Sequence, residues 1–283
     1  MLWFPFFALL TKFFGYEEND TKLSEAILET WQNETLDLCL DPIKNFAGNS
    51  AVSYRIHTNF EWINFEVRNV QPLLIRFVGF VPPHIVQRFQ KVHDNLELED
   101  TKVSGGADGN FISKSRQAKG QWFSKDDKNL LEIYQKFDNV FKMDSKTTEN
   151  FMMLSYDRFG HYAPHYDFLN FSIDSDNWWY KTYGDRLATA LFIIKTAEKG
   201  GGTVFPKLKV VISPEPGDMI LWFNANIKFE QEDLSFHGAC PILAGRKIAM
   251  SLWIRCRQHK DLKCQMNDEI LSHELNDIIR NFD

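Results

Sequence analysis

Apolar positions recur at helical spacing near both ends of the chain. Over residues 21–40 they fall at Leu23, Ile27, Trp31 and Leu38, which predicts an amphipathic helix. Over residues 266–283 they gather on one side of a second predicted helix, at Ile270, Leu271, Leu275, Ile278 and Ile279. We therefore expect the main domain to lie between these two helices.

The next part of the chain mixes strand and helix patterns. Residues 73–81 predict a strand that ends at Pro82 and Pro83, because proline cannot donate to a sheet. Helices are expected over residues 84–96 and near residues 126–141. A glycine turn is expected between them, at Gly105 and Gly106.

Short strands dominate from residue 151 onward. The predicted strands cover residues 151–156, 188–196, 202–205, 210–213, 218–223 and 247–256. Runs of short strands without intervening helices favour an antiparallel sandwich or jelly roll. We expect an α+β, mainly β fold: a double-stranded β-helix with helices packed on one sheet. We expect the chain to divide into an N-terminal extension (residues 1–65), the main domain (66–262) and a C-terminal helix (263–283).

Composition and charge narrow the class of protein. Apolar residues make up 44% and charged residues 25% of the chain, which is ordinary for a soluble globular protein. The net charge is −6 and no Lys/Arg cluster stands out, so a nucleic-acid substrate is disfavoured.

The first fifteen residues are apolar over about ten positions, which is too short to span a bilayer. They resemble the apolar region of a signal peptide but have no basic residues before it. Glycosylation sequons at Asn19, Asn33 and Asn170 add weak support for export. A secretory route, with the endoplasmic reticulum lumen as the compartment, is the expectation; a buried N-terminal segment is the alternative.

The four cysteines are Cys39, Cys240, Cys256 and Cys264, and none forms a C-x-x-C pair. A zinc ribbon or a thioredoxin-type site is therefore disfavoured. In an oxidising compartment they could form two disulfides by any of three pairings, and in the cytosol they would be buried thiols.

A metal site is suggested by His165 and Asp167. Alternate residues of a strand share a face, so one strand would offer both side chains to one ion. His237, 72 residues further on, would supply the third ligand. Two histidines and one carboxylate are typical of non-haem Fe(II) oxygenases, which keep positions open for a co-substrate and O2.

A second pattern, which suggests a binding site for a co-substrate, lies ten residues after His237. On the predicted final strand Lys247 would share a face with Ala249, Ser251 and Trp253. The small residues leave room for a flat diacid, and a buried ammonium requires an anionic partner. A dicarboxylate co-substrate would be such a partner.

Several blocks of the chain resemble the catalytic core of collagen-type prolyl 4-hydroxylases. They are YDRFGHYAPHYD, GDRLATALFIIKTAEKGGGTVFP, PGDMILWFN and FHGACPILAGRKIAMSLWI, with LLIRFVGFVPP and SRQAKGQWF upstream. The resemblance spans roughly residues 72–258, with the blocks in the family's order and spacing. It implies that residues 66–262 form an Fe(II)- and 2-oxoglutarate-dependent dioxygenase domain.

The resemblance also implies roles for individual residues. His165, Asp167 and His237 would bind Fe(II), and Lys247 would bind the distal carboxylate of 2-oxoglutarate. The remaining co-substrate residues would be Tyr156, at the same carboxylate, Thr203 and Trp253. O2 would be the second co-substrate and L-ascorbate would keep the iron reduced.

The implied substrate is a proline-rich or collagen-like peptide, with succinate and CO2 as co-products. Phe236 and Ile248 depart from the family pattern and leave the substrate's identity open. The alternatives are a 2-oxoglutarate oxygenase acting on lysine or a small molecule, and a catalytically silent peptide-binding module. His161 is expected to be a loop residue, and Cys240 a packed or disulfide-bonded thiol.

Overall fold

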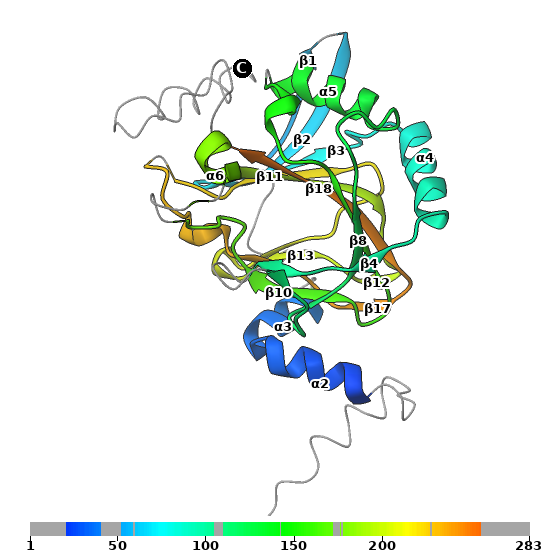
Figure 1. The fold of residues 1–283 in the computed structure, drawn as a ribbon, viewed down its shortest axis with the longest axis vertical. Coiled ribbons are helices and arrows are strands. Elements are labelled where there is room, and N and C mark those ends of the chain that lie inside the picture. Colours follow the sequence, from blue (N-terminus) through cyan, green and yellow to red (C-terminus); the bar gives the residue numbers. More distant parts are fainter. Residues whose placement is uncertain are drawn as a thin grey trace, which may run out of the picture.

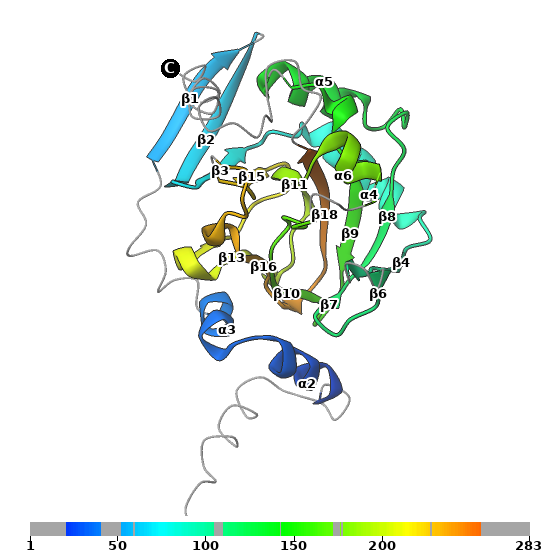
Figure 2. The same ribbon diagram turned by 60° about the vertical axis from the view of Figure 1, so that its left-hand side comes forward.

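The computed structural model describes residues 21–40, 52–58, 60–104, 110–141, 143–171, 176, 178–226 and 228–255. Within these residues two β-sheets face each other, and helices lie outside both of them (Figure 1, Figure 2). The paired strands are antiparallel. The expected jelly roll is thereby confirmed.

The larger sheet has nine strands. Their order is β1 (Val52–Thr58), β2 (Glu61–Val70), β3 (Leu73–Val78), β15 (Met219–Phe223), β11 (Arg186–Lys195), β18 (Lys247–Arg255), β9 (Met152–Tyr156), β8 (Lys119–Trp122) and β4 (Glu99–Asp100). Strands from distant parts of the chain are therefore neighbours, and β11 and β18 lie at the centre.

The facing sheet has five strands in the order β14 (Val210–Ile212), β13 (Thr203–Phe205), β16 (His237–Ala239), β10 (His161–His165) and β7 (Arg116–Gln117). Two small pairs complete the described strands: β12 (Lys199–Gly200) with β17 (Ile242–Ala244), and β5 (Val103–Ser104) with β6 (Asn110–Phe111). The five-stranded sheet matters most for function, because β10 and β16 are neighbours in it.

The central strands of the large sheet, β11, β15 and β18, are buried on both faces, which explains their nearly continuous apolar runs. On β18 one face packs into the main core through Ile248, Met250, Leu252 and Ile254. The other face turns toward the small sheet and carries Lys247, Ala249, Ser251 and Trp253. This alternation is the one predicted for the last strand.

Two helices cover the outer face of the large sheet. These are α4 (Pro83–Asp94), which begins with proline in its first turn, and α5 (Leu131–Phe141). Their buried stripes join the main core through Ile85, Phe89, Ile133, Phe137 and Phe141. The expected helices at residues 84–96 and 126–141 are confirmed, although the second starts five residues later.

The expected helix over residues 21–40 is two helices, α2 (Thr21–Thr30) and α3 (Asn33–Leu40). They pack outside the five-stranded sheet, through Ile27, Trp31 and Cys39 against Phe159, Ala163 and Val204. Helices therefore cover both sheets, and not one alone. Short helical segments lie at α6 (Trp178–Tyr183), η2 (Ser145–Thr147), η3 (Pro206–Leu208) and η4 (Asp233–Ser235).

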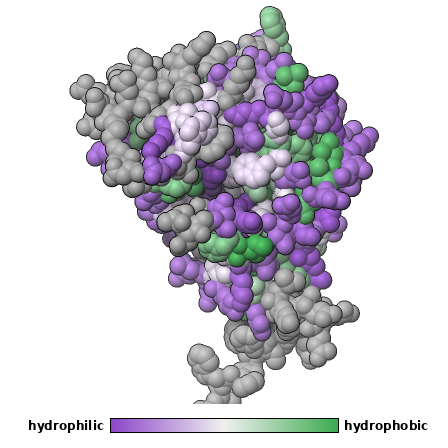
Figure 3. Space-filling model, viewed as in Figure 1, coloured by the Kyte–Doolittle hydropathy of each residue, from purple (hydrophilic) through white to green (hydrophobic). Residues whose placement is uncertain are grey.

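The face shown in Figure 3 is mainly hydrophilic, with its hydrophobic side chains in separate patches. Among the described residues, none of the helices has the length and apolar content needed to cross a bilayer. The predicted C-terminal helix and the turn at Gly105 and Gly106 lie outside the described residues. Strand β2 runs across the expected boundary at residue 65, and the division into three parts stays a prediction.

Candidate metal centre

Three potential metal ligands meet between the two sheets. His165 is the last residue of β10 and His237 the first residue of β16, and the two are direct cross-strand partners. Asp167 follows in the bend after β10 and is buried. Its Oδ1 lies 3.5 Å from His165 Nε2, and its Oδ2 lies 3.6 Å from His237 Nε2.

The ligand atoms of these three residues all lie within 4.8 Å of one another. The prediction that Asp167 lies on the same strand as His165 is wrong, because β10 ends at His165. The bend still turns the carboxylate toward both imidazoles. One ion could therefore contact two nitrogens and one carboxylate oxygen.

Both imidazoles are held in the tautomer that a metal requires. His165 Nδ1 lies 2.9 Å from the Ala163 carbonyl oxygen, and His237 Nδ1 lies 2.8 Å from the Ser235 carbonyl oxygen. A carbonyl only accepts, so each Nδ1 carries the hydrogen and donates it. Each Nε2 of the neutral ring then presents its lone pair to the other ligands.

The charge states suit metal binding as well. Burial lowers the pKa of His237 to about 4, and the neighbouring His165 acts in the same direction. Burial alone would raise the pKa of Asp167, but His237, His165 and Arg186 outweigh it and hold that pKa well below its usual range. At neutral pH the group is therefore a neutral imidazole beside an ionised carboxylate.

Asp167 is also held by a threonine from the large sheet. Thr189 Oγ1, on β11, donates to Asp167 Oδ2 over 2.7 Å. Arg186 Nη1, at the start of the same strand, lies 4.0 Å from Asp167 Oδ1. The carboxylate is thus contacted by residues of both sheets.

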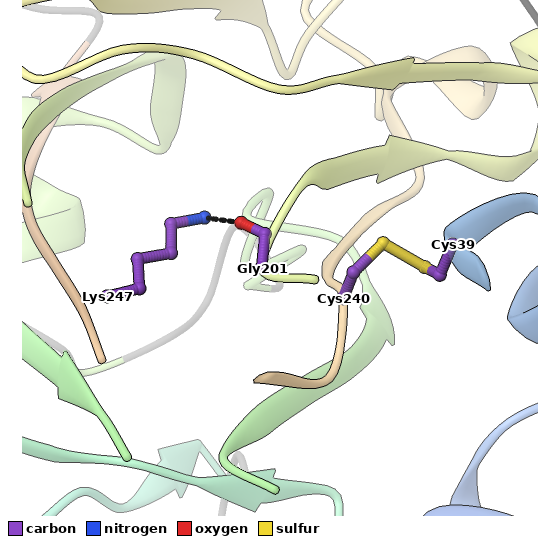
Figure 4. The surroundings of a disulfide bond; sticks show 4 residues. All are labelled: Cys39, Gly201, Cys240 and Lys247. Atoms are coloured by element: carbon purple, nitrogen blue, oxygen red, sulfur yellow. Dashed lines mark hydrogen bonds between the residues drawn. A yellow bond between two sulfur atoms is a disulfide. The ribbon is translucent and has the colours of Figure 1, made fainter. Parts of the chain in front are cut away.

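Lys247 lies in the same cavity, at the start of β18. It is buried, and its Nζ donates to the Gly201 carbonyl oxygen over 2.7 Å (Figure 4). Burial lowers its pKa to about 8, and no carboxylate of the described residues forms an ion pair with it. A buried ammonium without a counter-ion favours an anionic partner, because its desolvation is only partly compensated by one carbonyl oxygen.

The other three predicted co-substrate residues line this cavity too. Tyr156 is the cross-strand partner of Lys247, and burial raises its pKa, so its hydroxyl keeps its hydrogen. Thr203 Oγ1 and Trp253 Nε1 are buried and have no hydrogen-bond partner among the described residues. These polar atoms are available to a small polar ligand.

A wider groove opens beside the cavity and shares Arg116, Tyr162, His165, Asp167 and Trp253 with it. The Arg116 guanidinium lies 4.5 Å from the centre of the Tyr162 ring, and its Nη1 donates to the Lys102 carbonyl oxygen. The half-exposed ring of Trp122 contacts Trp253 at 5.7 Å between centres. The groove is therefore aromatic and cationic where it meets the ligand trio.

A buried ion-pair network of Glu149, Arg186 and Arg255 forms part of the lining of the groove. Glu149 accepts two hydrogen bonds from Arg186, at 2.7 and 2.9 Å, and pairs with Arg255 at 2.7 Å. The Arg186 guanidinium lies 3.9 Å from the centre of the Trp253 ring. Sequence reasoning missed Arg116, Tyr162 and Arg186, although each lies inside or next to a block that carried the family resemblance.

His161 is not a loop residue as expected: it opens β10 and is fully buried. Its ring lies between the carbonyl oxygens of Phe159 and Lys114, each 3.1 Å away, and edge-on to Trp31 under helix α2. It is no part of the ligand trio. The loop prediction failed because Gly160 and Pro164, which argue against a helix, are both compatible with a short strand.

Cys240 forms a disulfide with Cys39 of helix α3 (Figure 4). Their Cα atoms lie 5.6 Å apart, and the two residues are 201 positions apart in the sequence. This is one of the outcomes expected for Cys240, and it ties the helix pair to the segment directly after the strand that carries His237. Cys256 and Cys264 lie outside the described residues.

Comparisons with known proteins found one matching family model and several similar proteins. Residues 151–255 match the model of the 2OG-Fe(II) oxygenase superfamily, and this stretch contains all three ligands and Lys247. Subunit alpha-2 of prolyl 4-hydroxylase from Gallus gallus is 31% identical over 194 residues, covering 64% of this chain and 36% of the relative. Subunit alpha-2 from Caenorhabditis elegans is 25% identical over 221 residues, covering 76% and 40%.

The chain thus spans about two fifths or less of the length of these curated relatives. Among solved structures, a viral collagen prolyl hydroxylase from Paramecium Bursaria Chlorella virus-1, in complex with 2OG, has a TM-score of 0.48 and 20% identity. That match covers 64% of this chain and 95% of the viral chain.

Proposed function

We propose, from the premise that this chain carries a 2OG-Fe(II) oxygenase domain of the prolyl 4-hydroxylase type, that it hydroxylates proline in peptides. The observation that carries the proposal is one cavity holding both parts of such a site. It contains the trio His165, Asp167 and His237, and the unpaired ammonium of Lys247.

The donor set fits Fe(II). Two imidazole nitrogens and one carboxylate oxygen on one face are the facial arrangement of non-haem Fe(II) oxygenases. Bound Fe(II), with 2-oxoglutarate and O2, would supply the oxidation of an unactivated C–H bond, with succinate and CO2 as co-products. L-ascorbate is proposed as the reductant that maintains Fe(II).

The chain's own residues would bind and orient the co-substrate. Lys247 would pair with the distal carboxylate of 2-oxoglutarate and so gain an anionic partner, which it lacks among the described residues. The hydroxyls of Tyr156 and Thr203 would donate to the same carboxylate, which would satisfy the unpartnered Thr203 Oγ1. Ala249 and Ser251 are small enough to leave the space between Lys247 and the metal ligands free.

The groove would hold the peptide across the mouth of this cavity. Proline-rich segments adopt a preformed extended helix and bind in grooves lined by aromatic rings. Trp122, Tyr162 and Trp253 provide such rings, and the cationic side chains of Arg116 and Arg186 also line the groove. Trp253 would thereby be a shared wall of the co-substrate cavity and the substrate groove.

The disulfide is an indication of the cellular compartment in which the protein works. Disulfides persist in secreted proteins and in the lumen of the endoplasmic reticulum, and they are rare in the cytosol. The Cys39–Cys240 bond therefore supports the secretory route expected from the N-terminal sequence. We propose the lumen of the endoplasmic reticulum as the site of action.

The decisive experiment compares three reactions, each supplied with Fe(II), 2-oxoglutarate, ascorbate and 18O2. One contains a (Pro-Pro-Gly) repeat peptide, one contains a Lys-containing peptide without proline, and one contains no peptide. The expected result is one 18O atom on proline, with succinate formed only when the Pro-rich peptide is present. His165→Ala is the inactive control. If 18O is found on lysine instead, proline is not the substrate and the protein is a lysyl oxygenase.

An anaerobic titration separates the enzyme from a silent binding module. Fe(II) and 2-oxoglutarate together should produce a metal-to-ligand charge-transfer band, and Asp167→Ala should lose it. If the unmodified protein gives neither the band nor succinate, the proposed activity is wrong.

A further inference from the structure

We infer that Asn224 is a positioning residue of the metal centre: its side-chain amide sets the direction of the Thr189 hydroxyl, which in turn orients the Asp167 carboxylate. The inference rests on the proposed function, because it takes Asp167 as a metal ligand. It assigns a role to a fully buried side chain that touches neither the cavity nor the groove.

The backbone brings Asn224 to this position. Asn224 directly follows β15, and its N–H donates to the Leu187 carbonyl oxygen of the neighbouring strand β11 over 2.7 Å. This pairing places its side chain beside Thr189, two residues further along β11. Asn224 Nδ2 donates to Thr189 Oγ1 over 2.8 Å, and Thr189 Oγ1 donates to Asp167 Oδ2 over 2.7 Å.

The direction of this chain of hydrogen bonds is fixed by chemistry. An ionised carboxylate can only accept, and a hydroxyl has one hydrogen, so Thr189 gives its hydrogen to Asp167. The Thr189 oxygen can then only accept from residue 224. An amide nitrogen supplies that donor, whereas a carboxylate or an amide oxygen would oppose the lone pairs of the hydroxyl.

This arrangement matters because a carboxylate rotates easily about its terminal torsion. Thr189 gives Asp167 its shortest described hydrogen bond; the contacts with His165, His237 and Arg186 are 3.5 to 4.0 Å long. If the Thr189 hydroxyl could rotate away, the Asp167 carboxylate would lose this hydrogen bond. The hydrogen bond from Asn224 restricts the rotation of the Thr189 hydroxyl in the metal-free protein.

Asn224 is also joined to the third ligand, through its backbone. Its carbonyl oxygen accepts from Glu232 N over 2.8 Å, and the Glu232 carbonyl oxygen accepts from Ser235 N and Oγ over 3.1 and 2.7 Å. The Ser235 carbonyl oxygen accepts from His237 Nδ1. Side-chain replacements at 224 leave this second route in place, so the amide can be tested by itself.

The test measures metal binding and needs no substrate turnover. The full chain is titrated with Mn(II), and with Fe(II) under anaerobic conditions, in a calorimeter. Asn224→Ala and Thr189→Val should each weaken metal binding about tenfold, the lower end of the effect of residues behind a metal ligand. Asn224→Asp should weaken it more, because two carboxylates would compete for one hydrogen.

Two variants separate positioning from a general structural role. Thr189→Ser keeps the hydroxyl and should bind metal within about twofold of the unmodified protein, the usual tolerance for independent changes. Asn226→Ala is the matched control in the same loop. The Asn226 side chain bonds only to Lys228 and Glu230 among the described residues, and metal binding should again stay within about twofold.

The double variant gives the sharpest result. If Asn224 acts through Thr189, then Asn224→Ala combined with Thr189→Val should bind metal no more weakly than Thr189→Val alone. Additive losses, or Asn224→Ala with unchanged affinity, would overturn the inference. Thr189→Ser as weak as Thr189→Val would overturn it too. An unmodified protein that binds neither metal would instead refute the proposed function.

Discussion

At the residue scale, Lys247 decides most about what the cavity binds. Its ammonium is shielded from water and donates a hydrogen bond to one carbonyl oxygen, that of Gly201. The sequence predicted both its burial and its neighbours, because alternation along an apolar strand fixes which residues share a face. What it could not reveal is Gly201 as the partner of Lys247, since that contact joins segments 46 residues apart.

Replacing Lys247 with Ala should weaken 2-oxoglutarate binding about 10- to 100-fold, because hydrogen bonds to charged groups contribute about 1.5–3 kcal/mol. The measurement is an anaerobic titration of the Fe(II)-loaded protein with 2-oxoglutarate. Lys195→Ala is the matched control, an exposed lysine on the adjacent strand β11. Equal affinities of Lys247→Ala and the unmodified protein would show that the co-substrate binds elsewhere.

The same lysine predicts a pH dependence. With a pKa of about 8 in the free protein, Lys247 is charged below pH 8 and neutral above it. The dissociation constant of 2-oxoglutarate should therefore be flat from about pH 6.5 to 7.5 and rise up to tenfold per pH unit above 8. Lys247→Arg keeps its charge and should remove the rise; a rise that persists in this variant would point to another group.

At the element scale, the ligand trio depends on a pairing that no local pattern contains. His165 and His237 are opposite each other because β10 and β16 are neighbours, although β16 is three residues long and does not stand out in the sequence. The central strands of the large sheet, β11, β15 and β18, were predictable from apolar runs that are buried on both sides. Strands β1, β2 and β7 were missed because their patterns are mixed or their length is short.

Strand β18 offers a test of its two faces. Leu252→Ala, on the face packed against the helices, should lower the free energy of unfolding by about 2–5 kcal/mol, as for other buried leucines. Ala249→Leu, on the cavity face, should mainly block 2-oxoglutarate. Urea unfolding and co-substrate titration of both variants check this. The assignment of faces is wrong if the two effects are exchanged.

At the scale of the whole molecule, the N-terminal helices brace the ligand-bearing sheet from outside. Helix α2 lies over β10, helix α3 lies over β13 and β14, and the disulfide joins α3 to the end of β16. The sequence predicted helical structure over residues 21–40 and left three cysteine pairings open. It could not place the helices, because an amphipathic stripe does not specify which apolar surface covers it.

Loss of this disulfide should destabilise the protein by about 2–5 kcal/mol, since it closes a loop of roughly 200 residues in the unfolded chain. Urea unfolding of Cys39→Ser, Cys240→Ser and the double variant should give similar midpoints, all below that of the oxidised protein. Reductant should lower the midpoint of the unmodified protein and leave the variants unchanged. A reductant-insensitive midpoint in the unmodified protein would mean that the bond is absent.

Two of the three predicted metal ligands, His165 and His237, lie at strand ends of the five-stranded sheet, and Lys247 lies on the nine-stranded sheet. The spacing between the two sheets would therefore set the length of the dicarboxylic acid that fits. Facing sheets keep a separation of about 10 Å, and packed interiors resist compression. A four-carbon homologue would fall short of the ammonium, and a six-carbon homologue would have to buckle. Chain length, together with charge, would thus determine which dicarboxylic acid fits this cavity.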